Sequence, residues 1–230
     1  MVKNHLKTIA APKMWPVHRK SKKFLLRPNP GAHSMNSSVS LNFFLIELSQ
    51  ISKTKKESVS ILYNKEVLVN GKRRKEIEFP VGLFDVISIP EIKKNYRISI
   101  TKKGKITAFE IEAKEASGKA YKISNKKIVS GKTELNFSDG TNLMVDKDSF
   151  KVGDTLYIDF LKKNTIEHLK LEKGTTIFLT GGRHIGSLGK VEDIIGSKIV
   201  YKIKSNDVHE TLKEYAFVVG HDKPLFKIES

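Results

Sequence analysis

Apolar residues take up a helical spacing from Leu41 onward. Leu41, Phe44, Leu45, Leu48 and Ile51 fall at positions i, i+3, i+4, i+7 and i+10, which is the apolar stripe of an amphipathic helix. The spacing predicts a helix over these residues, followed by a short polar break.

A second helix is predicted to begin at Thr54. Residues 54–57 read Thr-Lys-Lys-Glu. This is a capping box, in which the threonine hydroxyl and the glutamate carboxylate each accept a hydrogen bond from a free backbone N–H group. Val59, Leu62 and Tyr63 continue the apolar face, and Asn64 is the predicted end.

A β-hairpin is predicted after the helices. Residues 66–69 read as a strand that leads into Asn70-Gly71. Both central residues of a type I′ turn need positive φ angles, which Asn and Gly tolerate. After an interruption, residues 83–89 predict another strand. Residues 41–95 thus predict a compact α-α-β unit.

Beyond residue 95 the pattern becomes β-rich. Short alternating runs predict strands at residues 97–100, 106–111, 127–129, 133–137, 143–145 and 155–160. Regular turn signals between them, such as Asp139-Gly140, favour a small antiparallel barrel or sandwich, and no helix of three turns is predicted. An apolar run at 174–179, a glycine-rich loop at 180–189 and a further alternating run at 190–195 follow.

The first 40 residues lack such a pattern. Prolines at positions 12, 16, 28 and 30 exclude one long helix, and the segment has too little apolar material to form a core of its own. We predict an extended, irregular arm that becomes ordered only against a partner. Its one tryptophan, Trp15, is better explained as pinning the arm to a protein surface than as stacking on a base.

The composition adds a strong positive charge. The chain contains 42 Lys and Arg and 25 Asp and Glu, for a formal net charge of +17, which indicates a polyanionic partner. Most of the excess lies in the first 105 residues, and no acid occurs before Glu47. Nucleic acid is favoured over an anionic membrane, because the prolines exclude a basic amphipathic helix and no apolar run is long enough to span a bilayer.

Two groups of cations lie where local electrostatics disfavours positive charge. Lys53, Lys55 and Lys56 crowd the predicted start of the second helix, where the helix dipole disfavours positive charge by about 0.3–1 kcal/mol each. Residues 72–75 read Lys-Arg-Arg-Lys and place four cations beside one hairpin turn. A phosphate backbone would neutralise both groups, whereas the alternative is a solvated surface run.

Motifs for catalysis or cofactor binding are not found. The chain has no cysteine, which excludes disulfides, cysteine-ligated metals and thiol nucleophiles. The glycine-rich loop fails as a nucleotide-binding P-loop, because position 184 is His and Val191 follows Lys190. The seven histidines form no His-Glu-x-x-His motif. We therefore expect no enzyme activity, no cofactor and no metal.

In their order along the chain, these features resemble the S-four-e family of archaeal and eukaryotic small-subunit ribosomal proteins. In the arm the resemblance rests on His5-Leu6-Lys7, Ala10-Ala11-Pro12-Lys13, Trp15, Arg27-Pro28 and Pro30-Gly31-Ala32-His33. Residues 67–73 and 79–87 resemble the family's S-four-type RNA-binding domain, and residues 174–195 resemble its KOW motif. The chain length is that of an archaeal member.

The resemblance implies an α+β, multidomain chain. Its expected parts are a basic N-terminal arm (1–40), an S-four-type RNA-binding domain (41–95), a central antiparallel β barrel-like domain (96–172) and an SH3-like KOW barrel (173–230).

The function implied by the resemblance is non-catalytic. We expect a protein of the cytoplasmic ribosome that binds small-subunit rRNA and neighbouring small-subunit proteins, and that supports assembly and translation. No membrane, small-molecule substrate or homo-oligomer is expected. The alternatives are an RNA-modification enzyme that uses the same hairpin, and a translation or transcription factor with a KOW motif.

RNA contacts are expected from three sets of residues. The phosphate clamps of the helical hairpin unit are Lys53, Lys55, Lys56, Lys72, Arg73, Arg74 and Lys75. The arm contributes Lys13, Arg19, Lys20, Lys22, Lys23 and Arg27. A second surface contains Arg183 and His184, and the residues expected to shape turns or loops are Asn70, Gly71, Gly181, Gly182, Gly186 and Gly189.

Overall fold

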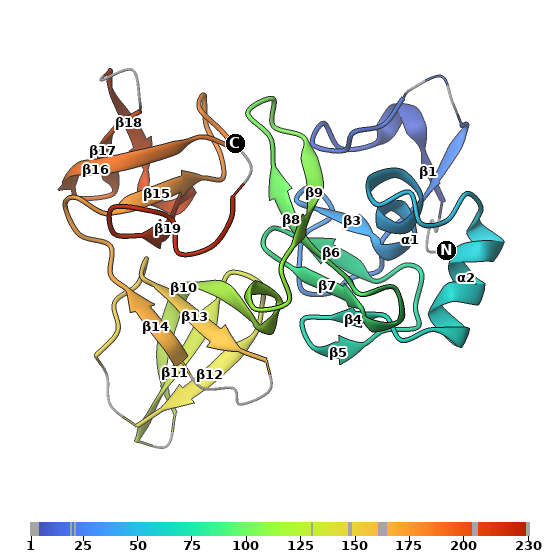
Figure 1. Cartoon of the computed structure of the whole chain (residues 1–230). Helices are drawn as coiled ribbons and strands as arrows, with labels where there is room; N and C mark the ends of the chain where they lie inside the picture. The colour runs from blue at the N-terminus through green and yellow to red at the C-terminus, as the bar shows by residue number, and fades with distance from the viewer. Residues whose placement is uncertain are drawn as a thin grey trace. The chain divides into compact units, whose positions relative to one another are not determined.

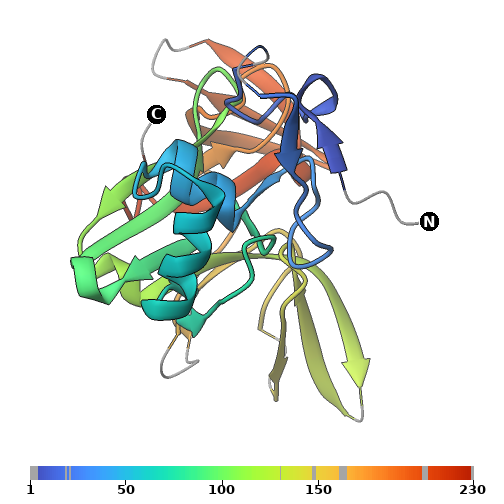
Figure 2. The same cartoon turned by 90° about the vertical axis from the view of Figure 1, so that its right-hand side faces the viewer.

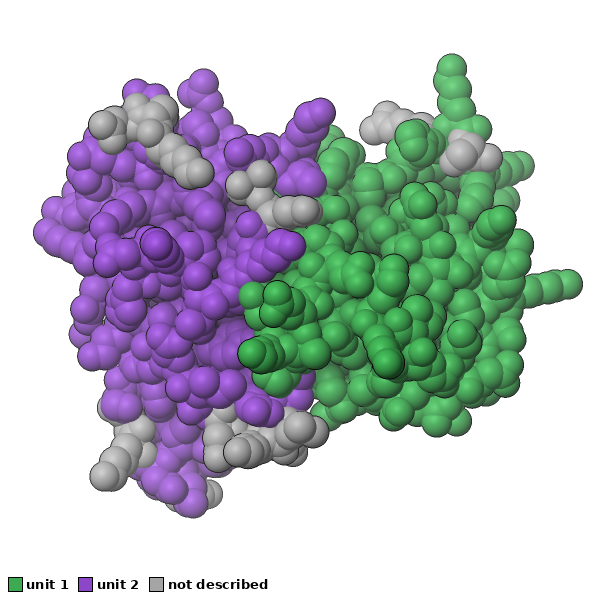
Figure 3. Space-filling view, in the orientation of Figure 1, with its two compact units in different colours: residues 1–100, 104–117 green, residues 101–103, 118–230 purple. Residues whose placement is uncertain are grey.

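The computed structural model describes residues 5–18, 20, 22–129, 131–146, 149–160, 165–203 and 207–228. The chain divides into two compact units (Figure 3): unit 1 comprises residues 1–100 and 104–117, and unit 2 comprises residues 101–103 and 118–230. The structure is mostly β, with several sheets. None of the described helices is long and apolar enough to span a membrane.

The first helix of unit 1 is short and changes type. It begins as α1 (Leu41–Phe43) and continues as the π-helix η2 (Phe44–Leu48). The wider turn is closed by the Ser49 N–H group, which donates to the Phe44 carbonyl five residues earlier (2.9 Å). The predicted extension to Ile51 is wrong, because Gln50 adopts a left-handed φ of 53° that ends the helix.

The second helix, α2 (Lys55–Asn64), confirms the predicted capping box. The Thr54 hydroxyl accepts a hydrogen bond from the Glu57 N–H group (3.3 Å), and the Glu57 carboxylate accepts one from the Lys53 N–H group (2.7 Å). The bond from the Lys53 backbone lowers the pKa of Glu57. The carboxylate therefore stays ionised and satisfies a free donor at the start of the helix.

A five-stranded antiparallel sheet completes unit 1. Its strand order is β5 (Lys72–Arg73), β4 (Leu68–Val69), β7 (Val86–Ile89), β8 (Lys94–Ile100) and β9 (Ile106–Ile111). The predicted Asn70-Gly71 turn is confirmed, with φ angles of 51° and 73°. The strand predicted over 83–89 begins only at Val86, because Phe84 has a φ of 60° and forms a turn. The sheet continues past residue 95, while the expected domain boundary there stays a prediction.

The helices lie on one side of this sheet (Figures 1 and 2). The core between them is formed by fully buried apolar residues, which include Phe44, Leu45, Leu62, Ile87 and Ile98. Burying each such side chain stabilises the fold by about 1.5–3 kcal/mol relative to exposing it. This core fixes α2 and the β4–β5 hairpin in one folded unit.

The arm is part of the same core, which overturns the prediction of a segment ordered only by a partner. Trp15 is 1% exposed and its ring lies 5.2 Å from that of Phe43. The Ile106 N–H group donates to the Met14 carbonyl (2.8 Å), and the ammonium of Lys105 donates to the Trp15 carbonyl (3.2 Å). The interpretation of Trp15 as a pin is therefore confirmed.

Short strands of the arm also form backbone hydrogen bonds with other strands. β1 (His5–Lys7) pairs with β2 (Phe24–Leu26), and β3 (Ser38–Ser40) pairs with β6 (Pro80–Gly82). Among its described residues, unit 1 also contains the short 3-10 helices η1 (Thr8–Ala10), η3 (Pro90–Ile92) and η4 (Glu115–Ser117). The backbone of the arm thus finds hydrogen-bond partners within the chain.

Unit 2 contains two five-stranded antiparallel sheets. The first has the order β12 (Asn142–Val145), β11 (Lys132–Phe137), β10 (Gly118–Val129), β13 (Thr155–Asp159) and β14 (Thr165–Leu169). The second has the order β18 (Val208–Leu212), β17 (Lys198–Lys202), β16 (Leu188–Ile195), β15 (Thr176–Leu179) and β19 (Ala216–Gly220). Between β18 and β19 lies η5 (Lys213–Tyr215). One apolar cluster lies on the first sheet, and a second joins Leu169 of β14 to residues of the second sheet.

Two lysines of β10, the buried Lys119 and the half-buried Lys122, have partners within the chain. The ammonium of Lys119 lies 2.8 Å from the carboxylate of Asp139. Burial alone would raise the pKa of Asp139, but the charge of Lys119 and hydrogen bonds with it and with Thr141 outweigh burial and lower that pKa. The ammonium of Lys122 donates to three backbone carbonyls of residues 213–216, and burial lowers its pKa to about 8.

Candidate nucleic-acid interface

Three exposed lysines surround the start of α2. Lys53, Lys55 and Lys56 form no ion pair with an acidic side chain among the described residues. The nearest acid in sequence, Glu57, is engaged by the Lys53 backbone. The helix start is therefore capped by Thr54 and Glu57, while three ammonium groups remain available to an anion.

A second group of cations lies at the other end of α2. One guanidinium nitrogen of Arg73 donates to the Tyr63 carbonyl in the last turn of the helix (3.2 Å). The ammonium of Lys75 lies 6.0 Å from the centre of the Tyr63 ring, which is 62% exposed. Lys72 is exposed beside them on β5. Since α2 rises by about 1.5 Å per residue, its ten residues separate the two groups by about 15 Å.

Arg74 differs from the other hairpin cations. It is half-buried, and its guanidinium lies 4.4 Å from the centre of the Phe79 ring. Its backbone N–H group donates to the Val67 carbonyl (3.0 Å). Arg74 therefore packs against the unit through a cation–π contact, and a phosphate contact by Arg74 stays a prediction. We define the α2 basic surface by the other six cations, Lys53, Lys55, Lys56, Lys72, Arg73 and Lys75.

A buried carboxylate holds the hairpin in place. Asp85 is 1% exposed and accepts hydrogen bonds from the Asn70 amide (2.8 Å), the Gly82 N–H group (2.8 Å) and the His33 ring (3.0 Å). The His33 ring also lies directly against Gly82, where a Cβ atom would not fit. Asp85 thus joins the arm to the turn that carries Lys72 and Arg73.

The predicted cations of the arm have several environments. Lys13, Lys20, Lys22, Lys23 and Arg27 are exposed. Lys22 pairs with Glu47 (3.2 Å), and the ammonium of Lys23 lies 5.6 Å from the centre of the Phe24 ring. Arg19 lies outside the described residues.

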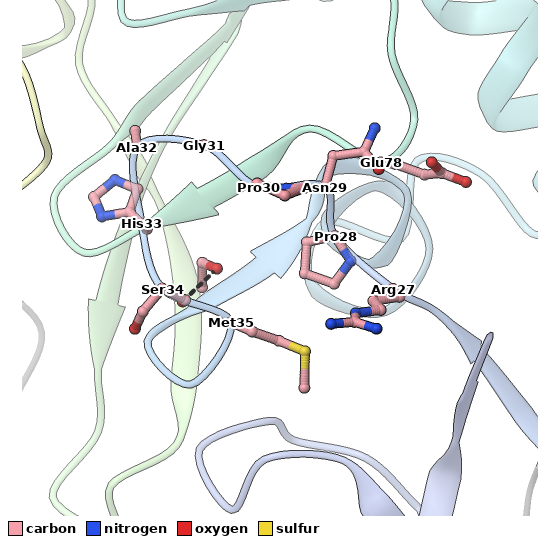
Figure 4. A pocket seen from close by; sticks show the side chains of 11 residues that line it. Arg27, Pro28, Asn29, Pro30, Gly31, Ala32, His33, Ser34, Met35 and Glu78 are labelled. Carbon is pink, nitrogen blue, oxygen red and sulfur yellow. Dashed lines mark hydrogen bonds between the residues drawn. The ribbon is translucent and has the colours of Figure 1, made fainter. Parts of the chain in front are cut away.

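Arg27 lines a hollow of about 410 Å³ on the arm (Figure 4). Residues 27–35 form most of its wall, together with Ser38 and Glu78. The charged side chains in this lining are Arg27 and Glu78, while His33 is engaged by Asp85. The hollow contains no nucleophile with an adjacent base and so lacks a catalytic constellation.

Five lysines of unit 2 differ from those around α2, because each has an acidic partner. Lys132 pairs with Asp146, Lys173 with Asp193, Lys190 with Asp222, Lys198 with Glu210 and Lys202 with Glu192, at 2.8–3.2 Å. Their charges are neutralised within the chain. Other cations of unit 2, among them Lys127, Lys170 and Arg183, are exposed and form no ion pair with a described acidic side chain.

The glycine-rich loop of unit 2 is built around Tyr215. A Cβ atom at Gly181 would lie 2.6 Å from the Tyr215 ring, so only glycine fits there. Gly182 and Gly186 have φ angles of 81° and 77°, and Gly189 packs against the Tyr201 ring. Arg183 is exposed, and His184 is half-buried with its ring 4.3 Å from that of His209.

Sequence reasoning missed three residues at these surfaces. Tyr63 was predicted only as part of a helix face, yet it lies exposed beside Arg73 and Lys75. Tyr201 and His209 are cross-strand partners, and the His184 ring contacts His209 from the glycine-rich loop; spacing along the chain gives no signal for this grouping. Among the described residues, no group of three or more His, Asp and Glu side chains could hold a metal ion.

Comparisons with known proteins show which family this chain resembles. The sequence profile described as ribosomal family S4e matches residues 92–166, and that of the RS4NT domain matches residues 2–36. The small ribosomal subunit protein eS4 of Methanosphaera stadtmanae is 38% identical over 98% of this chain and 96% of its own length. That of Archaeoglobus fulgidus is 35% identical over 99% of both chains.

A solved structure shares the fold as well. The crystal structure of the 30S ribosomal protein S4e from Thermoplasma acidophilum has a TM-score of 0.69 and 29% identity, and the match covers 80% of this chain and 95% of that one. The sequence similarity to the eS4 proteins is close to full-length on both sides. The chain belongs to the S4e family of ribosomal proteins, which are structural constituents and not enzymes.

Proposed function

We propose that this chain is a structural constituent of the small ribosomal subunit and binds small-subunit rRNA through the α2 basic surface. One observation carries the proposal: the six cations are exposed and form no ion pair with an acidic side chain among the described residues. Contacts of such cations with phosphates release condensed counterions, which is the main source of affinity for nucleic acid.

Family membership supports the same conclusion. Relatives of nearly the same length are named small ribosomal subunit protein eS4. A chain of this kind acts in the ribosome, in the cytoplasm, and meets rRNA together with neighbouring ribosomal proteins. Phosphate contacts would position the protein, while the shape of the RNA would select the site.

The proposal assigns roles to the parts of the chain. Residues 41–95 act as an S-four-type RNA-binding domain, 96–172 as a central β domain and 173–230 as an SH3-like KOW barrel. The five-stranded sheet β18-β17-β16-β15-β19 and the glycine-rich loop after β15 support the last assignment. The exposed arm cations Lys20 and Lys23 would extend the RNA contact beyond α2.

Sedimentation of the native protein tests this function. In a sucrose gradient of cell lysate, the protein should comigrate with the small subunit and remain there after a high-salt wash. A protein that stays at the top of the gradient, or that is washed off readily, would instead be a translation or transcription factor or an RNA-modification enzyme.

A further inference from the structure

A second pocket lies in unit 2, away from the α2 basic surface in the sequence. It has a volume of about 370 Å³, and its lining includes Gly182, Arg183 and His184 of the glycine-rich loop, Tyr201 of β17, His209 of β18 and Tyr215 of η5. We call it the His184 pocket. Sites for small ligands have volumes from about 300 Å³ upward, so a single nucleobase fits this space.

The lining brings several aromatic rings together. The His184 and His209 rings lie 4.3 Å apart with a tilt of 35°, and the His209 and Tyr201 rings lie 5.9 Å apart. Tyr201 is 2% exposed and forms the floor, whereas Tyr215 is 36% exposed at the rim. Flat rings at the surface are the means by which proteins hold unstacked RNA bases.

The polar groups of the pocket are suited to the edge of a base. Burial lowers the pKa of His184, and the neighbouring His209 and Arg183 lower it further. The imidazole is therefore neutral at neutral pH and offers one donor and one acceptor. Glu210, which is bound to Lys198 (3.2 Å), adds a carboxylate to the lining. The neutral ring and the carboxylate offer hydrogen-bonding groups to a base edge, while Arg183 supplies positive charge at the same lining.

One polar atom of the pocket lining lacks a hydrogen-bond partner within the described part of the chain. The Nε2 atom of His184 is buried and has no hydrogen-bond partner among the described residues. Leaving such an atom unsatisfied costs about 1–3 kcal/mol, and a hydrogen bond to a base edge would remove that cost.

We propose that the His184 pocket holds one unstacked base of the RNA, which stacks on His209 and forms an edge hydrogen bond with the His184 ring. The inference rests on the proposed rRNA-binding function and adds a base-specific contact to it. Arg183, which is exposed at the same loop, is positioned to stack on the base or to contact the adjoining phosphate.

Salt-dependent binding of the full-length chain to purified small-subunit rRNA tests the proposal. The variant His209→Ala should weaken binding by roughly 5- to 150-fold, which is the contribution of one stacked base. The slope of log Kd against log salt concentration should stay unchanged, because stacking releases no counterion. The control is Val208→Ala, since Val208 is exposed on the same strand outside the pocket.

A crosslinking experiment on the wild-type chain complements the binding assay. Ultraviolet crosslinking of the wild-type complex should join a nucleotide to a peptide that contains His184, Tyr201 or His209. If His209→Ala and Val208→Ala bind equally well and no such crosslink forms, the proposed base contact in the pocket is wrong, while rRNA binding itself still stands. A change of slope for His209→Ala would overturn it in favour of a phosphate contact. If the wild-type chain binds the rRNA without salt dependence, the proposed function itself fails.

Discussion

The side-chain amide of Asn70 donates a 2.8 Å hydrogen bond to Oδ1 of the buried carboxylate of Asp85. The carbonyl oxygen of the same amide accepts a hydrogen bond from the Val86 N–H group (3.0 Å). An amide makes both bonds because it carries a donor and an acceptor. The hairpin that presents Lys72 and Arg73 is thus fixed by a buried polar contact as well as by the positive φ angles of its turn.

Replacing Asp85 by asparagine should loosen this hairpin. An asparagine side chain has one oxygen and one NH₂ group, so at least one of the three donors that meet Asp85 would face another donor. We expect Asp85→Asn to lower the free energy of unfolding by about 2–3 kcal/mol, measured by chemical denaturation. The exposed Asp222→Asn should change it by less than about 0.5 kcal/mol. Equal effects of the two substitutions would show that Asp85 does not anchor the turn.

Trp15 should be as important to stability as a central core residue. Trp15→Ala removes a ring that is 1% exposed against Phe43, and we expect a loss of about 3–5 kcal/mol. Ile9→Ala is the matched control, because Ile9 lies in the same arm but is 78% exposed. A thermal transition of Trp15→Ala that matches the Ile9 variant would restore the view of an arm ordered only by RNA.

Acid should selectively remove the contribution of the Lys119–Asp139 pair. The pKa of Asp139 is lowered in the folded state, so the pair stabilises the fold above the carboxyl's unfolded pKa of about 4, and this stabilisation is lost as the pH falls through the lowered pKa. Asp139→Asn should cost about 3–5 kcal/mol at neutral pH, and the difference from wild type should shrink below pH 4. Denaturant unfolding across this pH range measures it.

The exposed pair of Lys132 and Asp146 provides the control. Asp146→Asn should have little effect at any pH, because exposed ion pairs contribute little. A constant deficit of Asp139→Asn from neutral to acid pH would mean that shape and not charge explains its effect.

Local chemistry in the sequence predicts local structure well. The capping box at Thr54 and Glu57 and the Asn70-Gly71 turn are each determined by two residues, and both have the predicted geometry. The strand predicted over residues 106–111 also has the observed bounds, because alternation is visible where one strand face is buried.

Features that depend on tertiary contacts could not be predicted in this way. The change from α1 to the π-helix η2 and the turn at Phe84 carry no local signal. The arm has little apolar content of its own, but the sheet supplies a surface for Trp15 and a backbone partner for Met14. Which lysines have acidic partners depends on strand pairing, so the total charge alone could not distinguish Lys72 from Lys198.

Salt dependence of rRNA binding tests the central claim most directly. The variant Lys72→Gln, Arg73→Gln, Lys75→Gln removes half of the α2 basic surface, and the control Lys190→Gln, Lys198→Gln, Lys202→Gln removes three lysines that are paired within unit 2. Each phosphate contact contributes about 0.7–0.9 to the slope of log affinity against log salt, so the first variant should lose about two units and the control almost none. Equal slopes for the two triple variants would contradict the account and remove the α2 basic surface from the RNA interface.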